Sequence, residues 1–473
     1  MVKFGTGGWR AIIGEEFTKE NIQKLTLAMC LKMKAEHKDT KSVVIGYDRR
    51  FLSKEAVIWA CQILGKEGIH VQFVNRSAPT PLLMFYVMKH ELDYGMMVTA
   101  SHNPAIYNGI KVFTYGGRDA DEIQTKDIEK WLLEAEKLYT PCHEEDGQMP
   151  PPSYTELVKQ GIVEEINPMN EYLDNILSVI NVDAIRKRDL RVAVDPMYGV
   201  SLTALSTILA VARCTVETIN AQHDTLFGGK MPAPAEDTLK NLQNYVLDRY
   251  CDIGIATDGD ADRLGVIDDK GHYLHANQIL VMLYYYLLKY RGWSGPCVRN
   301  NSTTHLLDRV AKDMGQQCYE VPVGFKYISA KMAETNAVIG GESSGGLAVR
   351  GHIAGKDGIY AAALLVEMLA VTGKSVSQLY QEITDKYGML YYEDAAFTMT
   401  QARKVELQEK LFVKLEVPDF GNAVEKINRT DGCKVYFTDG SWVICRFSGT
   451  EPLLRMAAEG ESQSQARTYI RIW

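Results

Sequence analysis

The sequence predicts an α/β protein of several domains, with β-α-β units and mixed or parallel sheets. The chain has 473 residues, and at roughly 150 residues per domain this length favours three or four domains. A unit made of an apolar β-rich run, a helix-compatible stretch and a second short apolar run occurs three times. Strands that alternate with helices in this way are typical of β-α-β crossovers.

The three units are separated along the chain, and the third is fainter than the other two. Given as strand, helix and strand, they are 42–48, 53–66 and 71–74; 191–195, 202–212 and 215–219; and 297–299, 304–314 and 318–321.

Breaks in composition suggest where the domains end. Pro150 to Pro152 follow an acidic run and mark the first boundary, and a second is placed near residue 271. After about residue 386 short strands such as 434–437 and 442–445 stand beside a helical stretch, 402–411, which predicts a smaller α+β module. The expected domains are 1–152, 153–270, 271–385 and 386–473.

Composition excludes several classes of protein. A hydrophobic fraction of 46% and a charged fraction of 24% are ordinary globular values, which excludes disorder and fibrous structure. The net charge of -8 gives no footprint for nucleic acid or for an anionic membrane, so neither partner is expected. A small anionic substrate would need a locally basic pocket.

Cysteine usage and the apolar runs bear on location. The nine cysteines form no C-x-x-C pair and are odd in number, which favours reduced thiols in the cytoplasm. The N-terminal residues lack the apolar core of a signal peptide. The longest apolar stretch, Ile279 to Leu288, is about half of a membrane span and is interpreted as a buried helix.

The first candidate loop is Val98 to Pro104, which follows an apolar strand. Ser101, with His102 beside it and Lys111 nearby, is a candidate nucleophile or phosphate carrier. A plain Ser/Asn/Pro turn is the alternative.

The second loop is Asp258-Gly259-Asp260-Ala261-Asp262-Arg263. On an extended backbone, carboxylates at i, i+2 and i+4 point to one side and offer three hard oxygen ligands to a divalent cation. An EF-hand is rejected, because its sixth position requires glycine where Arg263 stands. Mg²⁺ fits better, since it takes few carboxylates and completes its shell with phosphate or water; the alternative is an acidic surface turn.

The third loop, Ile339 to Gly346, contains a formal G-x-S-x-G match around Ser343. That motif requires a helix after the serine, whereas a strand-like stretch follows here. Glu342 and Ser344 fit better as groups that bind hydroxyls, and a glycine-rich turn remains the alternative.

The fourth loop runs from Arg446 to Arg455. Its small residues free backbone N–H groups, hydroxyls add donors and the two arginines flank them, a composition suited to cradling a phosphate. An arginine-bearing surface turn is the alternative.

Taken in this order, the four loops resemble those of the α-D-phosphohexomutase family, the phosphoglucomutases and phosphomannomutases. The N-terminal Phe4-Gly5-Thr6-Gly7-Gly8-Trp9-Arg10 also looks like the opening motif of that family, so the resemblance covers essentially the whole chain. It implies four domains around a central cleft, three with a shared α/β core and a smaller C-terminal α+β domain.

The resemblance also implies roles for residues. Ser101 would be the phosphoserine, and Asp258, Asp260 and Asp262 would bind Mg²⁺ together with its phosphoryl oxygen. Glu342 and Ser344 would hold sugar hydroxyls. The unreacting phosphate would be held by Arg446, Ser448, Gly449, Thr450 and Arg455. We expect Arg10, Lys111 and Arg263 to offset the negative charge, and His102 and Lys111 to be acid/base or charge partners.

The expected activity is interconversion of α-D-glucose 1-phosphate and glucose 6-phosphate by a monomer or dimer, with glucose 1,6-bisphosphate as intermediate and activator. Many bifunctional members carry histidine after the Glu-x-Ser-Gly of the sugar loop, where this chain has Gly346, so His352 or Lys356 would take its role. The segments around Gly324, Lys326 and Lys356 look more like phosphoglucomutases. Phosphomannomutase or bifunctional activity is the alternative, and pentose or amino-sugar phosphates stay open.

Two other classes of function fit the sequence less well. A serine hydrolase using Ser343 would need a later histidine, and only His352 follows it, nine residues on. A sugar-phosphate-binding protein without turnover would not need Ser101 together with all three aspartates.

Overall fold

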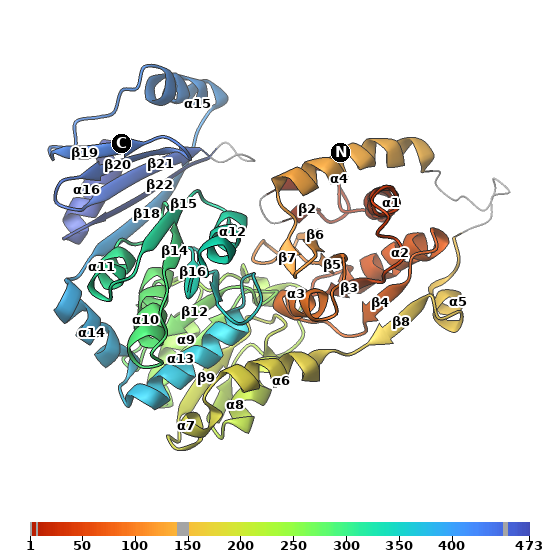
Figure 1. Ribbon diagram of the computed structural model, residues 1–473, viewed down its shortest axis with the longest axis horizontal. Helices are drawn as coiled ribbons and strands as arrows, with labels where there is room; N and C mark the ends of the chain where they lie inside the picture. The colour runs from red at the N-terminus through yellow and green to blue at the C-terminus, as the bar shows by residue number, and fades with distance from the viewer. Residues whose placement is uncertain (1, 6–7, 140–150, 448–452) are drawn as a thin grey trace. The chain divides into compact units, whose positions relative to one another are not determined.

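The computed structural model describes residues 2–5, 8–139, 151–447 and 453–473, which form two compact units (Figure 1). The first unit comprises residues 1–276 and 344–377, and the second comprises 277–343 and 378–473. Each unit contains two sheets. Within the described ranges, no single helix is long and apolar enough to cross a membrane.

The first sheet of the first unit is mixed. Its strands, in spatial order, are β1 (Phe4–Gly5), β2 (Gly8–Ile12), β6 (Tyr107–Thr114), β5 (Tyr94–Val98), β3 (Val43–Tyr47), β4 (Val71–Val74) and β8 (Val163–Ile166), with β7 (Arg118–Asp119) beside β6. Strands β5, β3, β4 and β8 are parallel, and β2 and β6 run antiparallel to their neighbours.

Helices cover both faces of this sheet. One face shares a core with α1 (Lys19–Ala35), α2 (Ser53–Lys66), α4 (Glu122–Leu138) and α5 (Tyr154–Lys159). On the other face α3 (Thr80–Lys89) packs Leu83 against Gly46. Helix α5 and strand β8 lie beyond the expected boundary at residue 152, because Leu157 fills a space over Gly65 of α2 and β8 pairs with β4.

The second sheet of the first unit has the order β10 (Thr215–Thr218), β9 (Arg191–Asp195), β11 (Ile253–Thr257), β12 (Leu264–Ile267) and β13 (Tyr273–Leu274). Helix α9 (Lys240–Asp248) packs on one face. The other elements around it are α6 (Met169–Val179), α7 (Val182–Arg186), α8 (Leu202–Val211), the short η2 (Phe227–Gly229) and α13 (Gly358–Thr372). Helix α13, which lies in the range expected for the third domain, is almost entirely apolar and packs on α7, α8 and β12.

The third sheet belongs to the second unit and contains the parallel strands β15 (Cys318–Val321), β14 (Cys297–Asn300) and β16 (Ile339–Gly341). Helices α11 (Leu306–Asp313) and α12 (Phe325–Thr335) supply its crossovers. Helix α10 (Ala276–Lys289) is buried along Ile279 to Leu287, as the sequence predicted, and α14 (Val376–Tyr387) follows later in the chain.

The fourth sheet is antiparallel, in the order β18 (Tyr391–Thr398), β22 (Leu453–Gly460), β21 (Trp442–Phe447), β20 (Cys433–Phe437) and β19 (Val424–Asn428). Helix α16 (Gln463–Ile472) packs on it, and α15 (Gln401–Gln408) continues into the π-helical η3 (Glu409–Val413). The predicted β-α-β units and the C-terminal α+β module are therefore confirmed.

The second sheet contains a buried carboxyl group that predicts a pH effect on stability. Burial raises the pKa of Asp195 from 3.8 to about 6. The native state therefore keeps this proton between about pH 4 and 6 while the unfolded chain releases it, so raising the pH across this range lowers stability. Between pH 4.5 and 7 this effect should lower the free energy of unfolding by on the order of 2 kcal/mol. We expect Asp195→Asn to abolish that decrease, as measured by denaturant unfolding at the two pH values. The same pH dependence in the variant would contradict this.

Candidate active site

Ser101 lies in a tight loop after β5 and is 1% exposed. Its φ of 53° lies in the left-handed region, which a residue with a Cβ adopts only when its surroundings hold it there. The Ser101 N–H donates to Thr99 Oγ1 at 2.8 Å, and the Thr99 hydroxyl donates to Asp48 Oδ2 at 2.7 Å. The loop is thus tied to the carboxyl end of the neighbouring parallel strand β3.

Arg50 holds the same loop by hydrogen bonds to its backbone. Its side chain is fully buried, with Nε 3.3 Å from Asp48 Oδ2. Its guanidinium donates, at 2.6 to 2.9 Å, to the backbone carbonyls of Ser101, Asn103, Pro104 and Tyr107. Only a planar, forked cation can satisfy so many carbonyls at once. Asp48 and Arg50 were not identified from the sequence, although their position directly after a β-rich run is the feature that could have indicated them.

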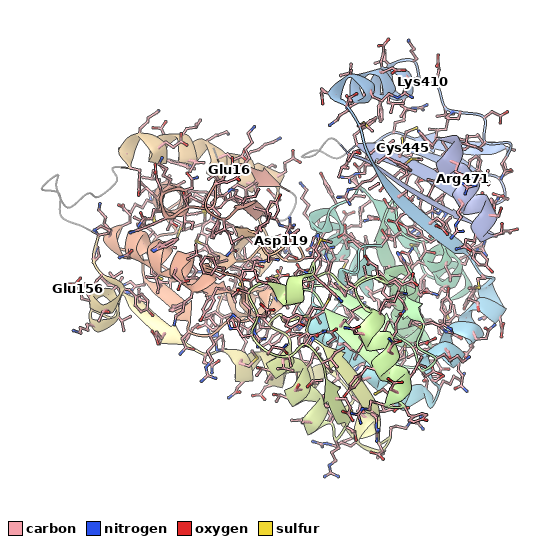
Figure 2. All side chains as sticks on the ribbon, turned by 180° about the vertical axis from the view of Figure 1, so that it is seen from behind. Glu16, Asp119, Glu156, Lys410, Cys445 and Arg471 are labelled. Carbon is pink, nitrogen blue, oxygen red and sulfur yellow. The ribbon has the colours of Figure 1, made fainter. Side chains whose placement is uncertain are left out.

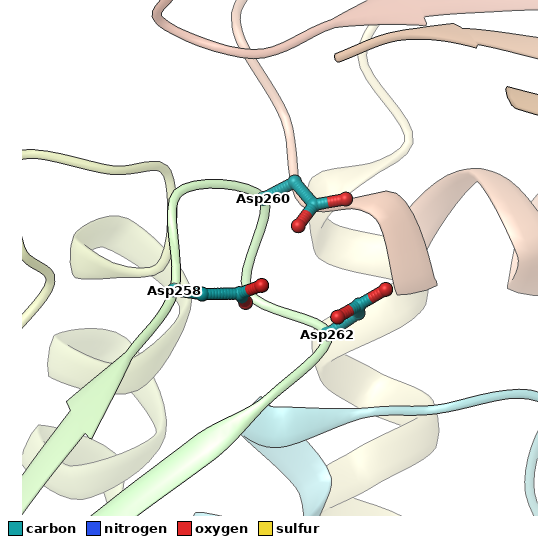
Figure 3. Close-up of side chains that lie close together, drawn as sticks. All are labelled: Asp258, Asp260 and Asp262. Atoms are coloured by element: carbon teal, nitrogen blue, oxygen red, sulfur yellow. The ribbon is translucent and has the colours of Figure 1, made fainter. Parts of the chain in front are cut away.

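The three aspartates occupy the turn between β11 and β12, and their side chains converge (Figure 3). The sequence analysis assumed an extended backbone here, but residues 259–261 form a turn, and Ala261 has φ 63°. The turn gathers one ligand oxygen from each carboxylate within 4.8 Å. Gly259 is required here, because a Cβ at this position would lie 2.8 Å from the Ser101 carbonyl oxygen.

The donor set fits a divalent metal ion. Asp258, Asp260 and Asp262 are at most 1% exposed. The Oδ1 atoms of Asp260 and Asp262 are buried and have no hydrogen-bond partner among the residues that the structure describes, which costs free energy unless a cation is bound. Hard carboxylate oxygens are the ligands that Mg²⁺ and Ca²⁺ take in proteins.

Cations and hydroxyls surround the acidic turn. Lys111 Nζ, on β6, lies 2.6 Å from Asp260 Oδ2 and 2.8 Å from Asp262 Oδ2. Lys356 Nζ lies 2.8 Å from the same oxygen of Asp262. The hydroxyl of Ser101 donates to Asp258 Oδ2 at 2.8 Å. The serine and the carboxylates therefore form one cluster, as the sequence analysis expected.

The pKa values follow from burial and from the lysines. Burial and repulsion from Asp262 and Asp260 raise the pKa of Asp258 well above its usual range. Burial would do the same to Asp262, but Lys111 and Lys356 hold its pKa well below that range. Burial would lower the pKa of Lys111, yet Asp260 and Asp262 raise it, so this side chain stays charged. Lys111 is therefore suited to be a charge partner rather than a base.

His102 and two arginines complete the cluster. His102 Nδ1 lies 3.4 Å from Ser101 Oγ, and burial, with the charges of Arg263 and Arg10, lowers the pKa of this histidine. The imidazole is therefore neutral. Arg10 donates to Asn103 Oδ1 at 2.6 Å, and the Arg263 N–H donates to Asp258 Oδ1 at 3.0 Å.

His352 is placed differently from the expectation of a sugar contact. Its side chain is 1% exposed, with Nε2 2.7 Å from Asp357 Oδ2 and Nδ1 2.9 Å from Asn175 Nδ2. Both ring nitrogens are thus engaged within the protein, which gives the residue a structural role. The same contacts argue against a catalytic triad with Ser343, which is followed not by a helix but by strand β17 (Leu347–Val349).

In the second unit, Glu342 lies at the end of β16. Its Oε1 accepts hydrogen bonds from Asn300 Nδ2 at 3.1 Å and from the Gly324 N–H at 3.2 Å. Lys326 follows on α12, with its Nζ 5.0 Å from the centre of the Tyr327 ring. Ser344, at the start of the segment assigned to the first unit, is exposed.

Arg446 and Arg455 are directly opposite each other on β21 and β22, next to Cys445, which lies within the C-terminal sheet (Figure 2). Arg446 Nε donates to Asp431 Oδ1 at 2.8 Å. The pairing brings two guanidinium-bearing residues together at one end of the sheet. The predicted Ser448, Gly449 and Thr450 lie outside the described residues, as do Thr6 and Gly7.

The β-α-β units share one local feature that sequence analysis missed. In each unit, a side chain at the end of the first strand or directly after it has an oxygen that accepts the N–H two residues later: Asp48 from Arg50, Asp195 from Met197, and Asn300 from Ser302, at 2.8 to 2.9 Å. The functional loop follows the strand that pairs with this one, β5, β11 or β16. Asp48 and Asn300 also contact that loop.

Parallel sheets with a serine loop, a buried acidic turn and paired arginines at strand ends are features suited to phosphoryl transfer. Models of the phosphoglucomutase/phosphomannomutase family match four parts of the chain: alpha/beta/alpha domain I at residues 1–138, domain II at 170–271, domain III at 275–387 and the C-terminal domain at 402–471. The chain belongs to this family of α-D-phosphohexomutases, which are intramolecular phosphotransferases.

Relatives that match this chain over nearly its full length are named for different substrates. A phosphoglucomutase/phosphomannomutase of Thermococcus kodakarensis is 32% identical over 99% of this chain and 97% of its own length. A phosphoglucosamine/phosphogalactosamine mutase of Sulfurisphaera tokodaii is 29% identical over 99% of this chain and 97% of its own.

Solved structures show the same fold. A protein of Thermus thermophilus, described provisionally as a phosphomannomutase, is 26% identical, with a TM-score of 0.84 over 100% of this chain and 98% of that chain. An Aspergillus fumigatus N-acetylphosphoglucosamine mutase, solved with GlcNAc-6P and magnesium, is 14% identical, with a TM-score of 0.59 over 100% and 95% of the two chains.

The buried pair of Asp48 and Arg50 gives a stability prediction. Arg50→Lys should destabilise the first unit by roughly 3 to 5 kcal/mol, because Asp48 and several carbonyls would be left buried without their partner. Thermal denaturation and limited proteolysis at residues 101–107 would measure this. The matched control is Arg49→Lys, since Arg49 makes only long contacts of 3.2 to 3.4 Å to carbonyls. Equal effects of the two substitutions would contradict the role of Arg50.

Proposed function

We propose that this phosphohexomutase acts as a phosphoglucomutase that interconverts α-D-glucose 1-phosphate and glucose 6-phosphate, with Ser101 as the phosphate carrier. The observation that carries the proposal is the hydrogen bond from the Ser101 hydroxyl to Asp258 in the buried acidic turn. A serine held there places its phosphoryl group beside a metal site and a group of cations.

The charges explain the division of roles. A phosphoserine adds roughly -1.5 to -2 charges to those of three carboxylates. Lys111 and Lys356 already contact the carboxylates, and Arg10 and Arg263 offset the phosphate. Asp258, Asp260 and Asp262 would hold Mg²⁺, which when bound supplies positive charge to the phosphoryl oxygens. Magnesium in the Aspergillus relative supports this choice of metal.

The chemistry transfers one phosphoryl group at a time. The bond between Ser101 Oγ and phosphorus breaks while a sugar hydroxyl oxygen bonds to phosphorus. The proton of that hydroxyl ends on Ser101 Oγ, which is restored as a hydroxyl. The resulting glucose 1,6-bisphosphate, which would also serve as activator, turns and returns its other phosphoryl group to Ser101. The protein contributes positioning and charge stabilisation. Glu342 and Ser344 would hold the sugar, and Arg446 and Arg455, with Ser448 to Thr450, the phosphate that does not react.

A second candidate is an amino-sugar phosphate. The Sulfurisphaera relative named for glucosamine and galactosamine covers 99% of this chain, and Gly346 stands where many bifunctional members carry histidine. With His352 enclosed in the protein, Lys356 is the remaining candidate to take over that histidine's contacts.

The activity is tested by ³¹P spectra of the protein with Mg²⁺, a trace of glucose 1,6-bisphosphate and α-glucose 1-phosphate. We expect glucose 6-phosphate to form, and Ser101→Ala to abolish the conversion because the phosphate carrier is lost. Ser343→Ala is the matched control and should retain activity. Parallel samples with the 1-phosphates of mannose and glucosamine rank the sugars; faster conversion of either would replace glucose as the proposed substrate.

The metal site is tested by titration calorimetry with MgCl₂ alone. Asp262→Asn should weaken Mg²⁺ binding by at least about tenfold, because one of three anionic ligands is removed. The control is Asp268→Asn: this buried carboxylate of the same domain accepts the Lys270 and His272 N–H groups in a turn. Binding that is equally weakened in both variants, or in neither, would contradict the assignment.

A further inference from the structure

Asp431, between β19 and β20, makes three contacts to separate parts of the second unit. Its Oδ1 accepts from Arg446 Nε at 2.8 Å, and its Oδ2 accepts from the Val323 N–H at 2.7 Å. Its carbonyl oxygen accepts from Asn301 Nδ2 at 2.9 Å. A single carboxylate thus joins the C-terminal sheet to the loop after β15.

The next amide along that loop is bound by the other functional carboxylate. The Gly324 N–H donates to Glu342 Oε1, and Asn300 donates to the same oxygen. The consecutive amides of residues 323 and 324 therefore donate to Asp431 and Glu342, respectively. At the end of β14, the consecutive side chains of Asn300 and Asn301 likewise donate to Glu342 and to the Asp431 carbonyl oxygen.

The backbone geometry supports this arrangement. Gly432, which follows Asp431, has φ 82°, and a Cβ there would lie 2.5 Å from the Cys445 carbonyl oxygen. The glycine lets the turn that carries Asp431 approach β21 directly beside Arg446. Gly324, with φ 131°, similarly allows the loop amides to turn toward the carboxylates.

We propose that Asp431 is a positioning residue that sets the distance between the phosphate-binding Arg446 and the sugar-binding Glu342. The inference rests on the proposed mutase function. A hexose phosphate bound by both groups requires a fixed distance between Arg446 and Glu342. The link through residues 323 and 324 maintains this distance by hydrogen bonds to carboxylates, which are stronger than hydrogen bonds between neutral groups.

The link has a definite kinetic consequence. Arg446 would hold the phosphate that does not react, which is bound equally in the ground state and the transition state. Loss of its alignment therefore raises KM and leaves kcat nearly unchanged. A residue needed only for folding would instead lower the amount of active enzyme, and so kcat, without changing KM.

The test compares Asp431→Asn with Asp419→Asn. Asp419 is a second carboxylate of the C-terminal domain, and its Oδ1 accepts the Gly421 N–H in an exposed turn. With glucose 1-phosphate as substrate, we expect Asp431→Asn to raise KM about tenfold or more, with kcat within about threefold, and Asp419→Asn to change neither. The double variant Asp431→Asn/Arg446→Lys should raise KM by clearly less than the product of the two single effects, because Asp431 acts in part by aligning Arg446. Unchanged KM in Asp431→Asn, or additive effects in the double variant, would overturn the proposal.

Hydrogen exchange separates failure of this inference from failure of the proposed function. In the protein without ligand, Asp431→Asn should speed exchange of the Val323 amide, while Asp419→Asn should not. If the unsubstituted protein converts no hexose phosphate, the proposed function fails, and the exchange result still decides whether Asp431 holds the loop. Exchange at Val323 that is unaffected by Asp431→Asn would show that the link does not exist.

Discussion

Three carboxylates buried in one short turn are the constraint on which the rest of the first unit depends. Charges removed from water must be compensated close by, and one domain alone does not supply the partners. Lys111 comes from the first sheet, Lys356 from the segment before α13, and Thr80 donates to Asp260 at 2.6 Å from α3. Compensation of these charges therefore ties together segments that are distant in sequence.

The same charge pattern suits the cluster to the phosphoryl transfer that we propose. The carboxylates contacted by lysines stay ionised, whereas burial and repulsion hold the pKa of Asp258, which accepts from the serine, above its usual range. His102 stays neutral because burial, together with the charges of two nearby arginines, lowers its pKa. Cations that stabilise the carboxylates are thus in place for the charge that a phosphate would bring.

Repetition of one β-α-β unit explains where the functional groups stand. Parallel strands end at the same edge of a sheet, so the loops after β5, β11 and β16 each lie beside the end of the first strand of their unit. At the end of that strand or directly after it stands Asp48, Asp195 or Asn300, which closes its own turn. The first and third of these side chains also hold the functional loop, whereas Asp195 pairs with Asn220 instead.

The sequence by itself determined the β-α-β units, the C-terminal module and the chemistry-bearing loops, because periodicity and local motifs are properties of neighbouring residues. Only the tertiary structure decided what those loops contact. It showed a turn where the sequence suggested an extended run of aspartates, it enclosed His352, and it revealed the roles of Asp48, Arg50 and Asp431. Arg50 contacts the Ser101 carbonyl 51 residues away and Asp431 contacts the Val323 amide 108 residues away, and no local pattern encodes such partners.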